Sequence, residues 1–149
     1  SYIVRPAHTF GPGQTIKDRR FISQLIKRSL TEKKAYIFGS GKSIKTWGYI
    51  AEVTSMFLNI MQHGKNNTYN TTSHHYYSIS EIAELIAKIA KVKFYKKKIG
   101  KNFVSKDYEK IKVSSKKYQR EFKTRMLKIP IQYGLRSLLE WNKLIFKIK

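Results

Sequence analysis

Apolar side chains recur at spacings of three and four residues in five segments, which predicts five amphipathic helices. The first helix opens near Asp18. Its buried face carries Phe21, Ile22, Leu25 and Ile26. The clearest helix begins at Ser78, because the Ser78 hydroxyl caps it and Glu81, three residues later, completes a capping box. The other helices are predicted over residues 50–61, 114–122 and 131–146.

Short runs rich in β-branched and aromatic residues lie between these helices and predict strands. The predicted strands cover residues 2–4, 35–38, 44–49, 68–72 and 92–98. Gly39 and Gly41 separate two of them, so we expect a tight turn that makes residues 35–38 and 44–49 the arms of a β-hairpin. Prolines and glycines predict an ordered turn over residues 5–13, and loops are expected over residues 73–77 and 99–112. Helices alternating with short strands place the chain in the α/β or α+β class.

The triplet Gly41-Lys42-Ser43 raises the alternative of a phosphate-binding P-loop. That motif requires a glycine five residues before Gly41, and position 36 is a tyrosine. It also requires a helix directly after the lysine, so that helix amides face the phosphates. Residues 43–49 alternate and favour a strand. We therefore interpret the glycines as a turn.

The composition fits one globular domain without disulfides. A length of 149 residues is enough to bury a core, and 41% of the residues are hydrophobic. The absence of cysteine excludes disulfides, thiolate nucleophiles and cysteine metal sites. The adjacent His74 and His75 have no further metal-like ligand spacing around them, so we predict no metal site. No apolar run approaches the roughly 20 residues that span a bilayer, and the first residues show no signal-peptide pattern, so we expect a cytoplasmic protein.

The net charge of +22 points toward anionic partners such as nucleic acid. Residues 88–128 hold 16 basic and 3 acidic residues, so more than half of the excess lies there. Aromatic residues are interleaved with these charges. They are Phe94, Tyr95, Phe103 and Tyr108. A stacking groove for nucleic acid is one interpretation. The other is a lysine-rich solvated surface, since 24 of the 31 basic residues are lysine.

The order of segments resembles a known family. An arginine strand runs into Phe-Gly-Pro-Gly over residues 5–13, and Gly-x-Gly, a basic residue and aromatics follow over residues 39–52. A serine-capped helix then carries Ile-Ala-Glu-Leu-Ile at 82–86. This order resembles the C-terminal half of extended short-chain dehydrogenases/reductases, the NAD-dependent nucleotide-sugar epimerases and dehydratases.

The resemblance implies an α/β, α+β-like fragment: the C-terminal substrate-binding portion of that fold without its Rossmann half. Within this single domain it assigns residues 1–13 to the last Rossmann-type strand and turn. Residues 14–91 would form the substrate-binding core, and residues 92–149 a basic C-terminal region.

The resemblance also implies the site residues. His8 stands where the family has an asparagine that contacts the sugar nucleotide, and Lys45 where a hairpin arginine pairs with the diphosphate. Trp47 matches the aromatic that follows, and Lys110 is the candidate for a later nucleotide-binding basic residue. The implied structural turns are Gly11-Pro12-Gly13, Gly39 and Gly41. From its own position, Trp47 is interpreted as an anchor of the hairpin rather than a stacking platform.

The family binds NAD, and its glycine-rich NAD loop and catalytic Ser/Thr, Tyr and Lys lie upstream of the matching part. The resemblance therefore implies that this chain binds a nucleotide sugar. In isolation it would bind no NAD and would have no catalytic activity. Its protein partner would be a separate N-terminal Rossmann half or a second copy of the chain. No membrane partner is expected. The alternatives are a basic nucleic-acid-binding protein and a degenerate gene fragment that exposes an apolar patch around residues 2–4 and the first helix.

Overall fold

The computed structural model describes residues 1–65, 67–98, 110–123 and 127–147, with the side chains of His75 and Lys110 excluded. The elements, in chain order, are β1 (Ile3–Pro6), β2 (His8–Phe10), α1 (Phe21–Thr31), β3 (Lys34–Phe38), β4 (Ile44–Tyr49), α2 (Ile50–His63), β5 (Thr68–Thr71), β6 (His75–Ser78), α3 (Ile79–Ala90), β7 (Lys93–Lys97), β8 (Lys110–Ile111), α4 (Lys116–Phe122) and α5 (Ile131–Phe146). The chain is thus a mixture of five helices and short strands in its described part, as the sequence predicts.

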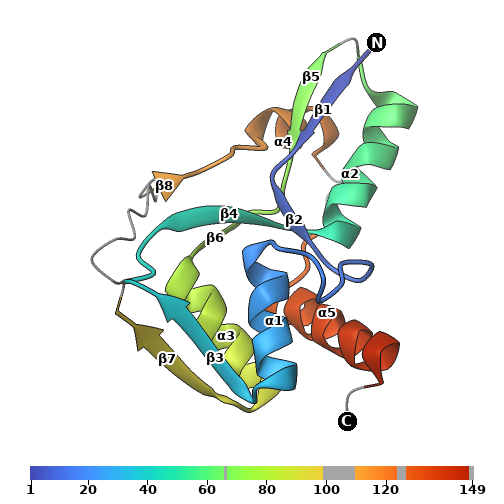
Figure 1. The fold of residues 1–149 in the computed structure, drawn as a ribbon. Helices are drawn as coiled ribbons and strands as arrows, with labels where there is room; N and C mark the ends of the chain where they lie inside the picture. Colours follow the sequence, from blue (N-terminus) through green and yellow to red (C-terminus); the bar gives the residue numbers. More distant parts are fainter. Residues whose placement is uncertain (66, 99–109, 124–126, 148–149) are drawn as a thin grey trace.

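The strands form three small sheets rather than one (Figure 1). β1 pairs in parallel with β5, and β3 pairs in parallel with β7. β4 is the centre of the third sheet, with β2 and the short β8 parallel to it along one edge and β6 antiparallel along the other. β1–β5 and the N-terminus lie at one end of the molecule, and β3–β7 and α5 lie toward the other.

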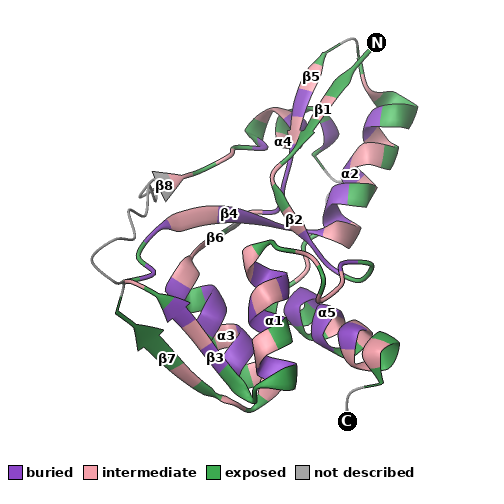
Figure 2. Cartoon of the chain, in the orientation of Figure 1, coloured by how far each residue is buried: buried purple, intermediate pink, exposed green. Residues whose placement is uncertain are grey.

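The main core lies between α1, α3, α5 and the inner faces of β3 and β4 (Figure 2). The helices meet there because each carries one apolar stripe, and Leu25, Ile26, Ile82, Ile86 and Leu138 are completely buried. A smaller cluster joins α2, β5 and α4 through Met56, Ile60, Tyr69, Tyr118 and Phe122.

The helix predictions are confirmed, most closely for α3 and α5. The Ser78 hydroxyl accepts a hydrogen bond from the Glu81 amide, and the Glu81 carboxylate accepts one from the Ser78 amide, so the capping box is present. α5 covers the predicted 131–146. α1 begins at Phe21 rather than near Asp18. The Asp18 carboxylate instead accepts the backbone amide of Arg20 at 2.8 Å and holds the turn before the helix.

The predicted β-hairpin is wrong. β3 and β4 are consecutive but do not pair with each other, since β3 pairs with β7 and β4 pairs with β2, β6 and β8. The glycine turn therefore carries the chain from one sheet to another. Alternation alone identifies a strand but not its neighbour, and here distant segments outcompete the adjacent one.

Two predicted irregular segments contain strands. Residues 5–13 include the end of β1 and all of β2, and residues 73–77 include most of β6. These strands have three or four residues, which is too short for an alternating pattern to stand out, and their pairing partners define them. Within the predicted loop at 99–112, residues 110 and 111 form β8, and residues 99–109 lie outside the described chain.

The apolar patch expected of a degenerate fragment is limited in extent. Tyr2 and Ile3 are 41% and 56% exposed, and Val4 is half-buried. α1, in contrast, buries Ile22, Leu25 and Ile26 completely or nearly so. The first helix therefore belongs to the core and not to an exposed face.

Candidate functional site

Strand pairing brings His8, Lys45 and Trp47 together. β2 and β4 run in parallel with His8 opposite Trp47, so these two side chains leave the same face of the sheet. Lys45 lies two residues before Trp47 on β4 and shares that face because the side-chain period of a strand is two. The ring centroids of His8 and Trp47 are 5.7 Å apart. Three residues taken from two distant segments thus occupy one surface.

This surface is one wall of a pocket of about 210 Å³. Its other walls come from the two helices that begin beside the sheet. Phe21 and Ile22 contribute from the first turn of α1, and Ile79 from the first residue of α3. The lining is mainly apolar, with a few polar groups at its rim, which is the usual make-up of a small-molecule site.

Trp47 forms a rigid wall of this pocket. Its side chain is 4% exposed, and its indole Nε1 donates to the Tyr77 carbonyl of β6 at 3.0 Å. The Phe21 ring lies 6.0 Å away, centroid to centroid. Trp47 is therefore a core anchor of β4, and the same burial fixes the side of the ring that faces the pocket.

Lys45 supplies a positive charge to the pocket. It is half-buried and forms no ion pair with a carboxylate in the described part of the chain. Partial burial of the ring lowers the pKa of His8, and the positive charge of Lys45 lowers it further. His8 is therefore a neutral imidazole near pH 7 beside a fixed cation, and an anion bound between them would raise its pKa again.

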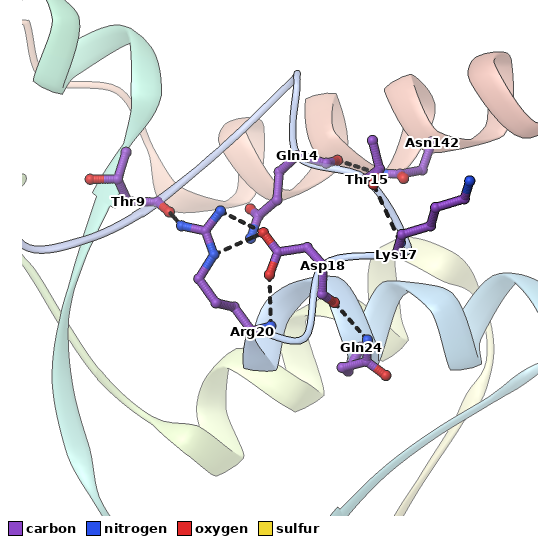
Figure 3. Close-up of polar contacts among 8 residues, drawn as sticks. All are labelled: Thr9, Gln14, Thr15, Lys17, Asp18, Arg20, Gln24 and Asn142. Atoms are coloured by element: carbon purple, nitrogen blue, oxygen red, sulfur yellow. Dashed lines mark hydrogen bonds and ion pairs between the residues drawn. The ribbon is translucent and has the colours of Figure 1, made fainter.

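Arg20 also lines the pocket, and the sequence reasoning missed it. Its guanidinium donates to Asp18 Oδ2 from Nε at 2.9 Å and from Nη2 at 2.6 Å, and to the Thr9 carbonyl at 3.2 Å (Figure 3). The hydrogen bonds from Arg20 lower the pKa of Asp18 to about 2. The charge of Arg20 is thus largely neutralised. A cation directly before a helix is disfavoured by the helix dipole unless an acidic residue neutralises it. An Asp two residues before an Arg at the start of a predicted helix is therefore the sequence signal that could have identified the Asp18–Arg20 pair.

The Gly11-Pro12-Gly13 turn frames a second, more open hollow of about 540 Å³ that shares Thr9, Phe10, Gln14 and Arg20 with the pocket. The Gln14 amide donates to the Gly11 carbonyl at 3.1 Å and closes the turn. The Asn142 side chain of α5 holds this turn against α5, because its amide donates to the Gln14 backbone carbonyl at 3.1 Å (Figure 3). Gly11 is required because a Cβ there would overlap the Ile50 side chain.

Gly39 and Gly41 have φ values of 78° and 65°, in the region that favours glycine. The Gly41 carbonyl accepts the Ser80 amide at 2.9 Å, and the Ser43 carbonyl accepts the Ile79 amide at 3.0 Å. This turn therefore caps α3 and sets the start of β4. Strand β4 begins at Ile44, directly after Ser43, so the helix that a P-loop requires after its lysine is not present at this position, and the rejection of a P-loop is confirmed.

Lys110 lies on β8, with its backbone opposite Ile44, one residue before Lys45. Its side chain lies outside the described structure, so its role as a ligand contact stays a prediction.

The resemblance places the family's catalytic Tyr and Lys upstream of this chain, but one Tyr and one Lys of the chain do have the separation Tyr-x-x-x-Lys. Tyr108 and Lys112 have the Tyr-x-x-x-Lys separation. Residue 108 lies outside the described chain. Lys112 directly follows strand β8 and not a helix, on which this separation would align two side chains, and its Nζ lies 5.0 Å from the centroid of the Tyr76 ring.

Glu52 holds the junction between β4 and α2. It is 2% exposed, and its carboxylate accepts hydrogen bonds from the Ser73 hydroxyl and from the Ile129 amide, the latter at 2.9 Å. Ser73 Oγ in turn accepts the Tyr49 amide at 3.1 Å. This buried carboxylate therefore fixes the C-terminal end of β4, two residues after Trp47.

Among the described residues, no three His, Asp or Glu side chains are grouped closely enough to hold a metal ion. In the same part of the chain, no helix has the length and apolar character needed to cross a bilayer.

Comparison with known proteins identifies relatives of this arrangement. Residues 1–72 match the model of the NAD dependent epimerase/dehydratase family. Two curated relatives are UDP-glucuronic acid decarboxylase 1 of Xenopus tropicalis, 24% identical over 87 residues, and its namesake in Arabidopsis thaliana, 21% identical over 87 residues. The matches cover 58% of this chain but only 21% and 20% of those proteins.

Solved structures share the fold over nearly the whole chain. UDP-glucose 4-epimerase of Thermotoga maritima, solved with UDP-glucose, superposes with a TM-score of 0.81 at 20% identity. UDP-glucuronic acid 4-epimerase of Bacillus cereus, in complex with UDP-glucuronic acid and NAD, gives the same values. Each match covers 97% of this chain and 46% or 45% of the other. Residues 1–72 thus resemble the NAD dependent epimerase/dehydratase family, and nearly the whole chain has the fold of the matching part of these solved epimerases.

Proposed function

We propose that this chain supplies the nucleotide-sugar-binding part of an NAD-dependent sugar epimerase or dehydratase, with the diphosphate held at Lys45. The observation that carries the proposal is the meeting of His8, Lys45 and Trp47 at one pocket, although the resemblance selected them from two separate segments. Two of the structural neighbours were solved with UDP-glucuronic acid, which supports a ligand of the same class.

The charges around the pocket assign a distinct task to each group. Lys45, which no carboxylate of the described chain engages, would bind the diphosphate as a point charge. Arg20 is already engaged by Asp18 and Thr9, so its contribution is to hold the mouth of the pocket in shape. His8, neutral beside Lys45, would donate to a ligand oxygen or accept a sugar hydroxyl.

NAD does not fit the residues that the structure describes. A pyrophosphate is bound in this class of folds where a glycine turn connects a strand to a helix N-terminus. Here the Gly39–Gly41 turn connects β3 to β4, a second strand, and the Gly11–Gly13 turn after β2 is separated from the start of α1 by residues 14–20. We therefore derive no step through NAD. A partner region that binds NAD, in another segment or another copy, would complete the site.

The binding claim is tested by titrating the protein with UDP-glucose in a calorimeter. Lys45→Gln should weaken the affinity by roughly tenfold or more, since hydrogen bonds to charged groups contribute about 1.5–3 kcal/mol. Lys42→Gln is the matched control, because Lys42 is exposed three residues earlier and does not line the pocket. Equal losses in both variants, or no binding to the wild-type chain, would contradict the proposal.

We also infer that the chain alone turns over no nucleotide sugar. Incubation of the purified chain with UDP-glucose and NAD⁺, followed by separation of the sugar nucleotides, tests this. Appearance of an epimerised or dehydrated product would show that the chain carries its own catalytic residues.

A further inference from the structure

The solvent face of the β3–β7 sheet gathers aromatic rings and basic side chains. The parallel register places Lys34 opposite Lys93, Tyr36 opposite Tyr95, and Phe38 opposite Lys97. Alternation turns Ala35 and Ile37 inward to the core and leaves these six residues on the outer face. We call this set the β3–β7 face. β7 is exposed along most of its length (Figure 2).

Two rings of this face are open to solvent. Phe38 is 54% exposed and Tyr95 is 43% exposed. The register places Tyr95 opposite Tyr36, which is two residues from Phe38 on β3, so the three rings share one face. Exposed apolar groups that are gathered on one surface mark binding sites, whereas single ones are common on any protein. The Phe38 ring also meets the edge of the Tyr36 ring, with centroids 5.8 Å apart, which limits its motion.

The third ring, Tyr36, organises the positive charges. Lys97 Nζ lies 3.6 Å from the centroid of the Tyr36 ring, and Arg28 Cζ lies 4.5 Å from it. The Arg28 guanidinium also donates to the Tyr36 carbonyl at 3.2 Å. Tyr36 therefore holds two cations against its ring, on the same face as the two open rings.

The face carries no charge of the opposite sign. Neither β3 nor β7 contains an acidic residue, and β7 contributes two lysines, Lys93 and Lys97, to the face. Its residues are also separate from the candidate nucleotide-sugar site, since none of the six lines the pocket that contains His8 and Lys45. A ligand of this face would be anionic and would offer flat surfaces to the rings.

We propose that the β3–β7 face binds single-stranded nucleic acid, with the bases stacked on Phe38 and Tyr95 and the phosphates placed at Lys34, Lys93, Lys97 and Arg28. Proteins that bind single strands combine a basic track with exposed aromatic rings, and stacking requires bases that are not already paired in a duplex. A ligand that is only a polyanion would use the lysines but would leave the two rings without a function.

The structure thereby narrows the nucleic-acid interpretation of residues 88–128. Tyr95 belongs to the proposed site, and Phe94 is half-buried and packs against the core. Phe103 and Tyr108 lie outside the described residues. Tyr36, Phe38 and Arg28, which precede that segment by many residues, enter the site only through the pairing of β3 with β7.

Fluorescence anisotropy of a labelled oligothymidylate of about 12 nucleotides tests the proposal, with an abasic strand of equal length as the comparison. The abasic strand keeps the phosphates and lacks the bases. The wild-type chain should bind oligothymidylate at least tenfold more tightly than the abasic strand. Phe38→Leu combined with Tyr95→Leu should remove most of this difference, since each stacked base contributes a roughly tenfold effect or more.

Leucine keeps apolar bulk at two exposed positions, so circular dichroism should show an unchanged fold. Tyr133→Leu is the matched control, because its ring is 60% exposed on α5 and lies outside the face. Lys34→Gln combined with Lys93→Gln should reduce the slope of log K against log salt by about 0.7 for each phosphate that the variant no longer neutralises. Excess UDP-glucose should displace no oligonucleotide.

Equal affinity for the oligothymidylate and the abasic strand would overturn the proposal. Leucine variants that bind like the wild type would do the same, as would displacement by UDP-glucose, because each outcome places the binding elsewhere or makes it a matter of charge alone.

Discussion

The candidate nucleotide-sugar pocket and the β3–β7 face are both positively charged surfaces, but they are built in opposite ways. In the pocket one lysine, which no carboxylate of the described residues pairs with, stands on a strand that is buried from Thr46 to Tyr49, and Arg20 is neutralised by Asp18. On the β3–β7 face several cations stand on strands that bury only their inner side chains. The pocket therefore depends on the position of one charge, and the face on the sum of many.

Gly41 lies in the turn between β3 of the β3–β7 face and β4 of the pocket, so a substitution there should disturb both surfaces. Gly41→Ala forces a side chain into the left-handed region at φ 65°, against Ile37 of β3 and 3.0 Å from the Ser80 amide nitrogen. We expect a loss of roughly 2–4 kcal/mol in the free energy of unfolding, from backbone strain and overpacking, measured by urea denaturation.

Gly13→Ala is the control for this variant. Gly13 has a positive φ of 95°, but a Cβ there meets nothing within 4 Å. Gly13→Ala should lower the free energy of unfolding only by the backbone strain. An equal loss in Gly13→Ala and Gly41→Ala would show that the contacts at Gly41 are unimportant.

The second comparison sets a buried ring against an exposed one. Trp47→Phe removes the indole donor to the Tyr77 carbonyl and should lower the free energy of unfolding by about 1–3 kcal/mol. Phe38→Leu, at a side chain that is 54% exposed, should stay within about 0.5 kcal/mol. Thermal or chemical denaturation measures both, and a larger effect at Phe38 would contradict the assignment of Trp47 as the anchor.

The third comparison concerns the geometry of one cation. Lys45→Arg replaces a point charge with a planar fork that matches a diphosphate, as the family resemblance implies at this position. We expect UDP-glucose affinity to rise several-fold in calorimetry while oligonucleotide affinity on the β3–β7 face stays unchanged. If the variant binds UDP-glucose more weakly, the diphosphate is not held at Lys45.

The smallest effect should come from pH. Burial and Lys45 lower the pKa of His8, so the free protein keeps the imidazole neutral as pH falls below 6.5, and a bound diphosphate restores its affinity for a proton. Binding then takes up a proton, and UDP-glucose affinity should rise a few-fold between about pH 7 and 5.5.

His8→Asn introduces the asparagine that the resemblance implies at this position, and it should flatten that pH profile. The same depressed pKa means that the unfolded chain binds more protons than the folded chain below pH 6.5, so stability should fall slightly with acidification in the wild type and less in His8→Asn. A pH profile of UDP-glucose binding that is the same in both proteins would remove His8 from the site.

Much of the local structure could be predicted because it depends on residues that are close together in the sequence. The periodic helices, the Ser78–Glu81 capping box and the glycine positions with positive φ each depend on groups within a few residues of one another. The candidate residues His8, Lys45 and Trp47 were available from the resemblance of two short segments. Arg20 was missed because its position at the pocket depends on its hydrogen bond to the Thr9 carbonyl of β2, which is eleven residues away in the sequence.

The sequence by itself determined the five helices, the strands β1, β3, β4, β5 and β7, and where the positive charge is concentrated, because these follow from periodicity and composition. Only the tertiary structure decided which strands pair. β3 pairs with β7 and not with β4, and this single outcome replaces a hairpin with two separate surfaces. The reason is that backbone hydrogen bonds are the same for every partner, so burial of the inner face against α1 and α3 selects the neighbour.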